Sequence, residues 1–354
     1  MPMSVGSARV LWQPRARWWH DLGTVMTRAV RLHEFGGPEV LRMEEVVVAE
    51  PGPGEVRLRI HAIGLNRTEI TLRSGRLPVK PPLPSPIGFE AAGIVEALGA
   101  GVAEVTIGAR VALVPAYSAS QYGLYGELAL APARSLVPIP NNVGFVEAAA
   151  TWAAFGTAWS GLVSVGSLLA GQSVLITAAS SSVGLAAIQT ANLLRARPIA
   201  LTRTAAKAHA LLAHGAAAVI VTDAQDVVAA TRRLTGGAGA QLVFDAVGGP
   251  GFATLARATA AGGKLVLYGA LDARKTEIPP FDVFARDLTV RGAALTAATR
   301  ADATLAALKR FVSEGLASGA LHPTIARTFS FNDIVDAHRF MEGGEQVGKI
   351  VVTV

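Results

Sequence analysis

The stretch Ser173–Gly184, SVLITAASSSVG, predicts a short buried strand, a turn of small residues and the start of a helix. Val174, Leu175 and Ile176 form an apolar run typical of a parallel strand that is covered on both faces. The following turn carries little side-chain bulk, which lets a ligand approach its backbone. The first turn of the helix leaves N–H groups unpaired at the positive end of the helix dipole, where a phosphate or pyrophosphate binds well. The stretch is therefore a candidate dinucleotide site.

Around this stretch, strands and helices alternate from about residue 145 to residue 289. This alternation predicts a doubly wound parallel sheet, the Rossmann type of α/β fold. The predicted strands cover residues 174–177, 198–201, 218–221, 242–245, 264–268 and 288–291. The predicted helices cover residues 185–195, 205–214, 226–234 and 251–261.

The chain before and after this region has a different pattern. Short strands separated by turns run from Thr27 to about Asn141 and indicate a small, mainly β, barrel-like domain. After about Ala293 we expect helices at 301–313 and 331–341 and strands at 325–331 and 349–354, returning to this first domain. The predicted division is an extension at 1–26, a catalytic domain at 27–150 and 294–354, and a nucleotide-binding domain at 151–293. The first 25 residues differ in composition from the rest, and we expect Met26 to be the natural start.

The composition limits the chemistry of the protein. A chain of 354 residues usually forms two domains, and the absence of cysteine excludes disulfides, iron–sulfur clusters and thiol nucleophiles. The net charge is +6, but the basic residues are scattered, so nucleic-acid binding is not expected. No apolar run reaches the roughly 18 residues of a membrane helix. A cytoplasmic location fits this composition.

Several segments together resemble the medium-chain dehydrogenase/reductase superfamily, and within it the zinc-free branch similar to quinone oxidoreductases. They are LHEFGGPEVL (32–41), EPGPGEVRLRIHAIGLNRTEI (50–70), IGFEAAGIVEALGAGV (87–102), SVLITAASSSVG (173–184), DAVGG (245–249), LVLYGAL (265–271) and VGKIVV (347–352). The resemblance covers nearly the whole chain from Thr27 onward. It implies a chaperonin-like β catalytic domain, a Rossmann domain and a nicotinamide cofactor between them. It also implies a homodimer formed through the sheet edge near residues 288–291.

The residues at the family's zinc-ligand positions decide the expected chemistry. Asn66 stands where zinc alcohol dehydrogenases have a cysteine ligand, and Phe89 stands where they have a histidine. Neither side chain is a strong zinc ligand, and the seven histidines show no paired ligand spacing. We therefore predict no metal. Hydride transfer to an electron-poor carbon of a quinone or an α,β-unsaturated ketone needs less help than alcohol oxidation, because a hydrogen-bond donor can stabilise the resulting enolate.

The residues after the second Rossmann strand predict which nicotinamide cofactor binds. An NAD site has a carboxylate there for the ribose hydroxyls, whereas this chain has Arg203 and then Lys207. A phosphate favours such cations, and Thr202 and Ser180 add hydroxyl donors. In the resemblance, Lys207 matches a phosphate-binding lysine. We predict NADP(H).

The resemblance implies further cofactor contacts. Ser181 and Ser182, followed by Val183, replace the family's glycine pair at the pyrophosphate. Thr157 lies in a turn that faces the phosphate on the nicotinamide side. The remaining expected contacts are Val247, Tyr268, Gly269, Ala270 and Lys349.

The candidate catalytic residues are Asn66, Thr71, Tyr117 and Tyr125. The amide of Asn66 is placed to orient the acceptor or the nicotinamide ribose. Thr71 occupies a position where several quinone reductases have tyrosine. Tyr117, Tyr122 or Tyr125 from a nearby loop is therefore the substitute proton donor, with water as the alternative. Glu90 is expected to be structural.

The sequence therefore predicts a zinc-independent, NADPH-dependent oxidoreductase that reduces a small-molecule quinone or enone. An alcohol dehydrogenase is the first alternative. An NADP-binding or nucleic-acid-binding regulatory protein is the second.

Overall fold

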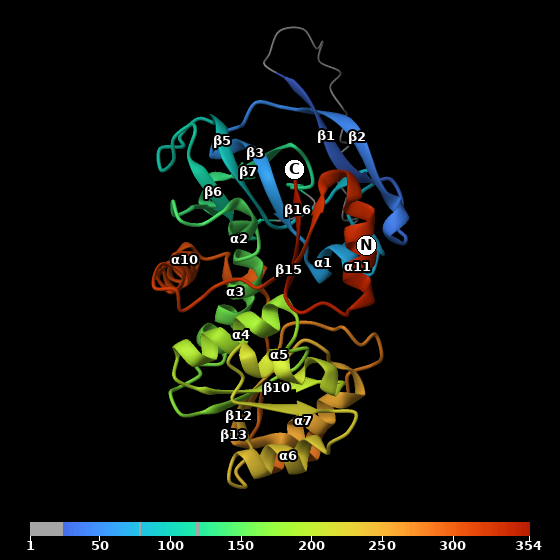
Figure 1. Cartoon of the computed structure of the whole chain (residues 1–354), viewed down its shortest axis with the longest axis vertical. Helices are drawn as coiled ribbons and strands as arrows, with labels where there is room; N and C mark the ends of the chain where they lie inside the picture. Colours follow the sequence, from blue (N-terminus) through green and yellow to red (C-terminus); the bar gives the residue numbers. More distant parts are fainter. Residues whose placement is uncertain (1–23, 78, 118–120) are drawn as a thin grey trace, which may run out of the picture.

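The computed structural model describes residues 24–354, except 78 and 118–120. Most of the predicted extension at 1–26 lies outside the described residues; the first described strand, β1, starts at Val25. The chain forms an upper, mainly β part and a lower α/β part (Figure 1). The short helices α2 (Phe145–Ala149) and α3 (Trp152–Trp159) lie between the two parts.

The lower part contains a six-stranded parallel sheet in the order β11-β10-β9-β12-β13-β14. Strand β9, the first of these six in the sequence, lies in the middle of the sheet. The later strands extend the sheet on both sides of β9, which is the Rossmann order. Its strands are β9 (Ser173–Ile176), β10 (Arg197–Thr202), β11 (Ala218–Val221), β12 (Ala240–Asp245), β13 (Thr259–Leu267) and β14 (Thr289–Gly292).

Helices connect these strands. They are α4 (Ser182–Leu193), α5 (Ala208–Ala213), α6 (Val227–Leu234), α7 (Phe252–Ala258) and α8 (Pro280–Ala285). The helix predicted to end at residue 261 ends at Ala258, because Thr259 already begins β13 and pairs with Ala240 of β12. Val174, Leu175 and Ile176 of β9 are fully buried, so the apolar run is covered on both faces, as expected from the sequence.

The upper part is built on two sheets. One has the order β2-β1-β4, and the other has β15-β16-β3-β5-β6-β8, with β7 also paired to β3. The bounds are β1 (Val25–Leu32), β2 (Leu41–Val48), β3 (Glu55–Gly64), β4 (Ser85–Pro86), β5 (Ala91–Leu98), β6 (Arg110–Leu113), β7 (Leu128–Pro132) and β8 (Leu136–Pro138). Helix α1 (Arg67–Arg73) follows β3 directly.

The C-terminal segment crosses back from the lower part to the upper one (Figure 1). It contains α9 (Leu295–Ala298), α10 (Asp302–Ala317), β15 (Ile325–Ser330), α11 (Ile334–Gly343) and β16 (Lys349–Thr353). Strand β16 pairs antiparallel with β3, so residues from the end of the chain meet α1. Leu295 and Leu308 belong to an apolar core that includes residues of both parts, among them Ala62 and Ile176.

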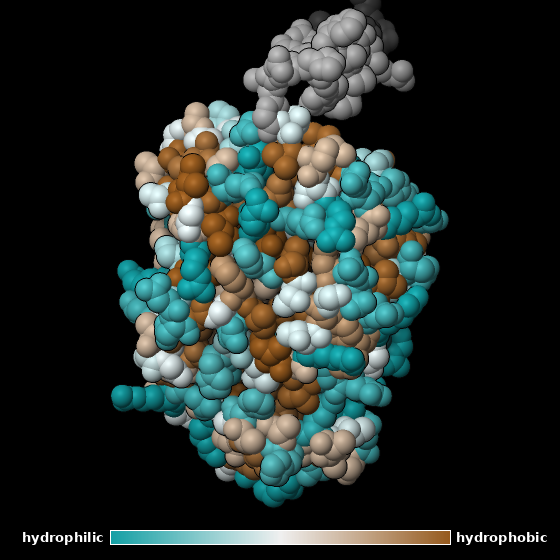
Figure 2. All heavy atoms as spheres, turned by 45° about the horizontal axis from the view of Figure 1, so that its top comes forward, coloured by the Kyte–Doolittle hydropathy of each residue, from teal (hydrophilic) through white to brown (hydrophobic). Residues whose placement is uncertain are grey.

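The described residues form no helix that is both long enough and apolar enough to cross a membrane. Figure 2 shows hydrophilic side chains spread over the visible face, with hydrophobic residues interspersed among them.

Candidate functional site

A cleft of about 1380 Å³ lies where the two parts meet. Its walls come from the turn before α4, the carboxyl ends of β10, β12 and β13, helix α1 and the start of β16. Ligands in open α/β sheets bind at the carboxyl ends of the strands, where the strand order reverses, and β9, β10 and β12 meet at that point here. The cleft is therefore the candidate functional site.

The turn between β9 and α4 brings backbone groups to this cleft. Ala178 has a φ of 46°, a left-handed conformation that sharply reverses the chain. Ser181 begins α4 with extended backbone, and its side chain accepts the N–H of Gly184 at 3.0 Å. The serine that replaces a family glycine therefore caps the helix and needs no left-handed conformation. A side chain at Gly184 would lie 2.5 Å from the Ala179 carbonyl oxygen, so the close turn requires glycine there.

The cleft beside this turn is strongly basic. Arg203 and Lys207 line it, as does Arg67 from α1. The Lys207 ammonium donates to the carbonyl oxygens of Gly344 at 2.9 Å and Gln346 at 3.3 Å. Burial lowers the pKa of Lys207, and the neighbouring Arg203 and Arg67 lower it further. Glu345 acts on Lys207 and Glu342 on Arg67 in the opposite direction, so the repulsion is partly offset. A bound phosphate would add a charge-assisted partner for these cations.

The carboxyl end of β12 is held by a buried carboxylate. Asp245 is fully buried and accepts the Thr177 hydroxyl at 2.7 Å and the N–H groups of Val247 at 2.9 Å and Gly248 at 3.0 Å. These bonds fix the turn that presents Val247 to the cleft. This role of Asp245 was not predicted, although the residue begins the DAVGG segment that resembles the family.

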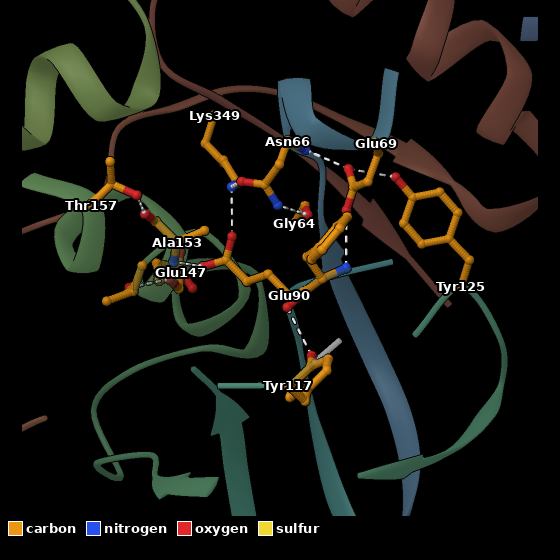
Figure 3. A network of polar contacts seen from close by, with 12 residues as sticks. Gly64, Asn66, Glu69, Glu90, Tyr117, Tyr125, Glu147, Ala153, Thr157 and Lys349 are labelled. Atoms are coloured by element: carbon orange, nitrogen blue, oxygen red, sulfur yellow. Dashed lines mark hydrogen bonds and ion pairs between the residues drawn. The ribbon is translucent and has the colours of Figure 1, made fainter. Parts of the chain in front are cut away.

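A buried polar network forms the upper wall of the cleft (Figure 3). The Lys349 ammonium pairs with the Glu90 carboxylate at 2.6 Å and donates to the Asn66 amide oxygen at 2.7 Å. Lys349 is 2% exposed and Glu90 is fully buried. The second Glu90 oxygen accepts the N–H of Ala153, at the start of α3, at 2.8 Å. Glu90 thus binds both Lys349 and the start of α3, which suits the structural role expected for it, and it sets the position of Lys349.

The structure brings most of the predicted site residues to this one cleft. The residues that line it are Asn66, Thr71, Thr157, Ser180, Ser181, Ser182, Val183, Thr202, Arg203, Lys207, Val247, Tyr268, Gly269, Ala270 and Lys349. Arg67 also lines the cleft, although the sequence analysis did not assign it to the site. Arg67 directly follows the predicted site residue Asn66, and this position in the sequence could have indicated that it lies in the cleft.

The two predicted tyrosines do not reach the cleft, and this expectation is corrected. Tyr117 donates to the Phe89 carbonyl at 2.8 Å, and Tyr125 donates to the Glu69 carboxylate at 2.8 Å (Figure 3). Both side chains are buried in the apolar core of the upper part. They were predicted from a loop, but their rings pack inward because each hydroxyl finds a buried acceptor.

Replacing either tyrosine by phenylalanine tests this correction. We expect Tyr117→Phe and Tyr125→Phe to leave turnover within about threefold of the wild type. Each should lower the free energy of unfolding by about 1–3 kcal/mol, because a buried acceptor loses its partner. Steady-state kinetics and urea unfolding measure the two effects, and a hundredfold loss of turnover in a stable variant would restore the tyrosine as proton donor.

Tyr125 connects Glu69 to a buried histidine. Its hydroxyl lies 3.0 Å from Nε2 of His338, which is fully buried on α11. Burial lowers the pKa of His338 to about 3, and burial raises the pKa of Glu69 to about 7. His338 therefore stays neutral in the folded protein at pH values where the unfolded chain, with an ordinary pKa of 6.5, binds a proton.

This difference predicts a loss of stability as the pH falls from 6.5 toward 3. Relative to a His338→Leu variant, the wild type should lose about 2 kcal/mol of unfolding free energy between pH 7 and pH 5, at about 1.4 kcal/mol per pH unit below 6.5. Glu69 acts in the opposite direction in both proteins, so the comparison largely cancels its contribution. Urea unfolding of both proteins at the two pH values provides the measurement. If the difference in unfolding free energy between the wild type and His338→Leu is the same at pH 7 and pH 5, His338 is not held neutral.

The donor set at the expected metal position does not fit zinc. Within the described ranges, no three histidine, aspartate or glutamate side chains lie together as metal ligands would. The oxygen atoms of Asn66 and Glu90 already bind the Lys349 ammonium, whose positive charge would repel a metal ion.

Two family models match the chain: an alcohol dehydrogenase GroES-like domain at residues 52–141 and a zinc-binding dehydrogenase domain at residues 182–313. A quinone oxidoreductase of Pseudomonas aeruginosa is 36% identical over 244 residues, covering 69% of this chain and 74% of that protein. A 2-haloacrylate reductase of a Burkholderia species is 31% identical, covering 92% of this chain and 99% of that protein.

Among solved structures, a quinone oxidoreductase of Escherichia coli complexed with NADPH superposes with a TM-score of 0.85 and 28% identity. That match covers 92% of this chain and 100% of the other. These relatives agree with the structure, in which the parallel strands have the Rossmann order and the cleft lies at their carboxyl ends. The chain belongs to the medium-chain dehydrogenase/reductase superfamily, in its quinone oxidoreductase branch.

Proposed function

We propose that the protein is an NADPH-dependent oxidoreductase that transfers hydride to a quinone or an α,β-unsaturated carbonyl compound. The observation that supports this most is the basic wall of the cleft. There Arg203 and Lys207 lie beside the turn between β9 and α4, which requires glycine at position 184. The relatives named quinone oxidoreductase and 2-haloacrylate reductase act on acceptors of this class, and a solved relative binds NADPH.

The residues in the cleft fit a phosphorylated dinucleotide. The N-terminus of α4, capped by Ser181, suits the pyrophosphate, and Arg203 with Lys207 suits the additional phosphate of NADP(H). Tyr268, Gly269 and Ala270, directly after β13, line the same cleft as Asn66. When bound, the cofactor supplies the hydride, and the chain's own residues bind and orient the acceptor.

An acceptor panel tests the proposed function. The purified protein should oxidise NADPH in the presence of quinones such as 1,4-benzoquinone, or enones and 2-haloacrylates, without added metal. Activity that depends on stoichiometric zinc and an alcohol would instead indicate an alcohol dehydrogenase. Salt-sensitive RNA binding without turnover on any acceptor would indicate a regulatory protein.

We also propose that two copies associate through β14. This strand ends the six-stranded sheet and leaves one edge unpaired within the described residues. Phe281 and Phe284 on the neighbouring α8 are 77% and 66% exposed, and their rings lie 5.2 Å apart. An exposed aromatic pair beside an open edge suits an isologous contact with a second copy.

The double variant Phe281→Ser/Phe284→Ser should therefore shift the protein from dimer toward monomer. Burial of two aromatic rings is lost from each copy, so we expect the dimer dissociation constant to rise at least a hundredfold. Analytical ultracentrifugation measures this. Leu169→Ser, which removes a comparably exposed apolar residue (63%) elsewhere, is the matched control and should change nothing. A monomeric wild type would contradict the proposal.

A further inference from the structure

We propose that Lys349 donates a hydrogen bond to the carbonyl oxygen of the acceptor, and that Glu90 is the residue that positions it. This inference rests on the proposed function. It gives Lys349 a contact with the acceptor, whereas the family resemblance implies a contact with the cofactor.

The backbone around Lys349 leaves room for this network of side chains. A side chain at Gly64 would lie 2.0 Å from the Ala149 carbonyl oxygen, 2.9 Å from the Glu90 carboxylate and 3.0 Å from the Lys349 side chain. The absence of a side chain at Gly64 therefore makes room for the ion pair. Glu90 comes from the turn before β5, Lys349 from β16 and Asn66 from the start of α1, so three separate segments converge on one ammonium group.

Lys349 has hydrogen-bonding capacity left for a ligand. Its ammonium has three protons, and within the described residues one is bound by Glu90 and another by Asn66. Lys349 lines the cleft with a side chain that is 1% exposed, and we infer that its third proton faces a group bound there.

The two threonine hydroxyls of this wall already use their donors within the protein. The Thr71 hydroxyl donates to the Arg67 carbonyl at 3.2 Å, and the Thr157 hydroxyl donates to the Ala153 carbonyl at 2.7 Å. The Asn66 amide nitrogen donates one bond to the Gly64 carbonyl at 3.0 Å. Both candidate tyrosines are buried elsewhere. Lys349 is thus a cationic donor held directly beside Asn66, and Arg67, the next residue of α1, is a second cation that lines the cleft.

The reaction requires a donor of this kind. When hydride adds to the electron-poor carbon of an enone, the electron pair of the C=C bond moves onto the carbonyl oxygen and an enolate forms. A cationic donor that is already fixed in position stabilises this developing charge. Lys349 keeps its proton in this step, and the α-carbon of the enolate is protonated afterwards by water. Glu90 holds the ammonium in place before the acceptor arrives.

Binding of 4-nitrophenolate, a stable anion whose oxygen resembles that of an enolate, tests the proposal without turnover. Its absorbance is followed during titration of the protein with and without NADP⁺. The principal variant is Glu90→Gln/Lys349→Met, which removes both charges and so leaves neither buried alone. Lys349→Arg keeps a cationic donor. Lys264→Met is the matched control, because Lys264 donates to the Gly166 carbonyl at 3.0 Å and does not line the cleft.

We expect the double variant to bind 4-nitrophenolate at least tenfold more weakly, with kcat for an enone reduced about a hundredfold and the Kd of NADPH within threefold of the wild type. Lys349→Arg should recover part of both losses, and Lys264→Met should match the wild type. Unchanged phenolate binding, or no phenolate binding by the wild type, overturns the proposal. So does a tenfold rise in the NADPH Kd with kcat unchanged, which would make Lys349 a cofactor ligand. Failure of the proposed function is separate: the wild type would then not oxidise NADPH with any acceptor.

Discussion

Replacing Arg203 and Lys207 together by alanine should weaken NADPH binding by a factor of about 10²–10⁴ while changing NADH binding less than threefold. A hydrogen bond to a charged group contributes about 1.5–3 kcal/mol, so two such contacts to the phosphate sum to about 3–6 kcal/mol. NADH lacks this phosphate, so its binding free energy does not depend on these two contacts. Isothermal titration with both cofactors measures the two effects.

Lys207 also holds the segment before β16, through the carbonyl oxygens of Gly344 and Gln346. A change at Lys207 alone therefore mixes phosphate recognition with local structure. Arg203→Ala separates the two, since no described hydrogen bond involves the Arg203 side chain, and we expect it to retain the selective loss of NADPH. Arg197→Ala, at the opposite end of β10, is the control. Equal weakening of NADPH and NADH would mean that these cations do not bind the phosphate.

Replacing Glu90 by alanine should cost about 3–5 kcal/mol of unfolding free energy. The change leaves the Lys349 ammonium buried without its counter-charge and leaves the Ala153 N–H without its acceptor. Glu90→Gln keeps the bond to Ala153 and should cost less. Urea unfolding at neutral pH gives both values. A loss below 1 kcal/mol in Glu90→Ala would show that the pair is solvated or rearranges at little cost.

The sequence predicted the Rossmann sheet well, because the pattern there is local. The fully buried run Val174–Ile176 and the small residues after it fix a strand, a turn and a helix within twelve positions. Cations directly after β10 could be assigned to the cleft because the carboxyl ends of parallel strands meet at one edge. The end of α7 was misplaced, since the transition into β13 depends on pairing with β12.

The upper wall of the cleft was harder to predict. Lys349 and Glu90 lie 259 positions apart, and the antiparallel register of β16 against β3 decides that they meet. The error with Tyr117 and Tyr125 has the same origin: a tyrosine in a segment rich in glycine and serine suggests a surface loop, yet its inward orientation depends on buried acceptors such as Glu69. Non-local pairings of this kind leave no trace in a single sequence.

The most direct test of the central claim, that this cleft recognises the extra phosphate of NADP(H), is the dissociation constant of the wild-type protein for NADPH and NADH under identical conditions. The arrangement of Arg203 and Lys207 predicts that NADPH binds at least a hundredfold more tightly. Equal affinities, or tighter binding of NADH, would contradict it.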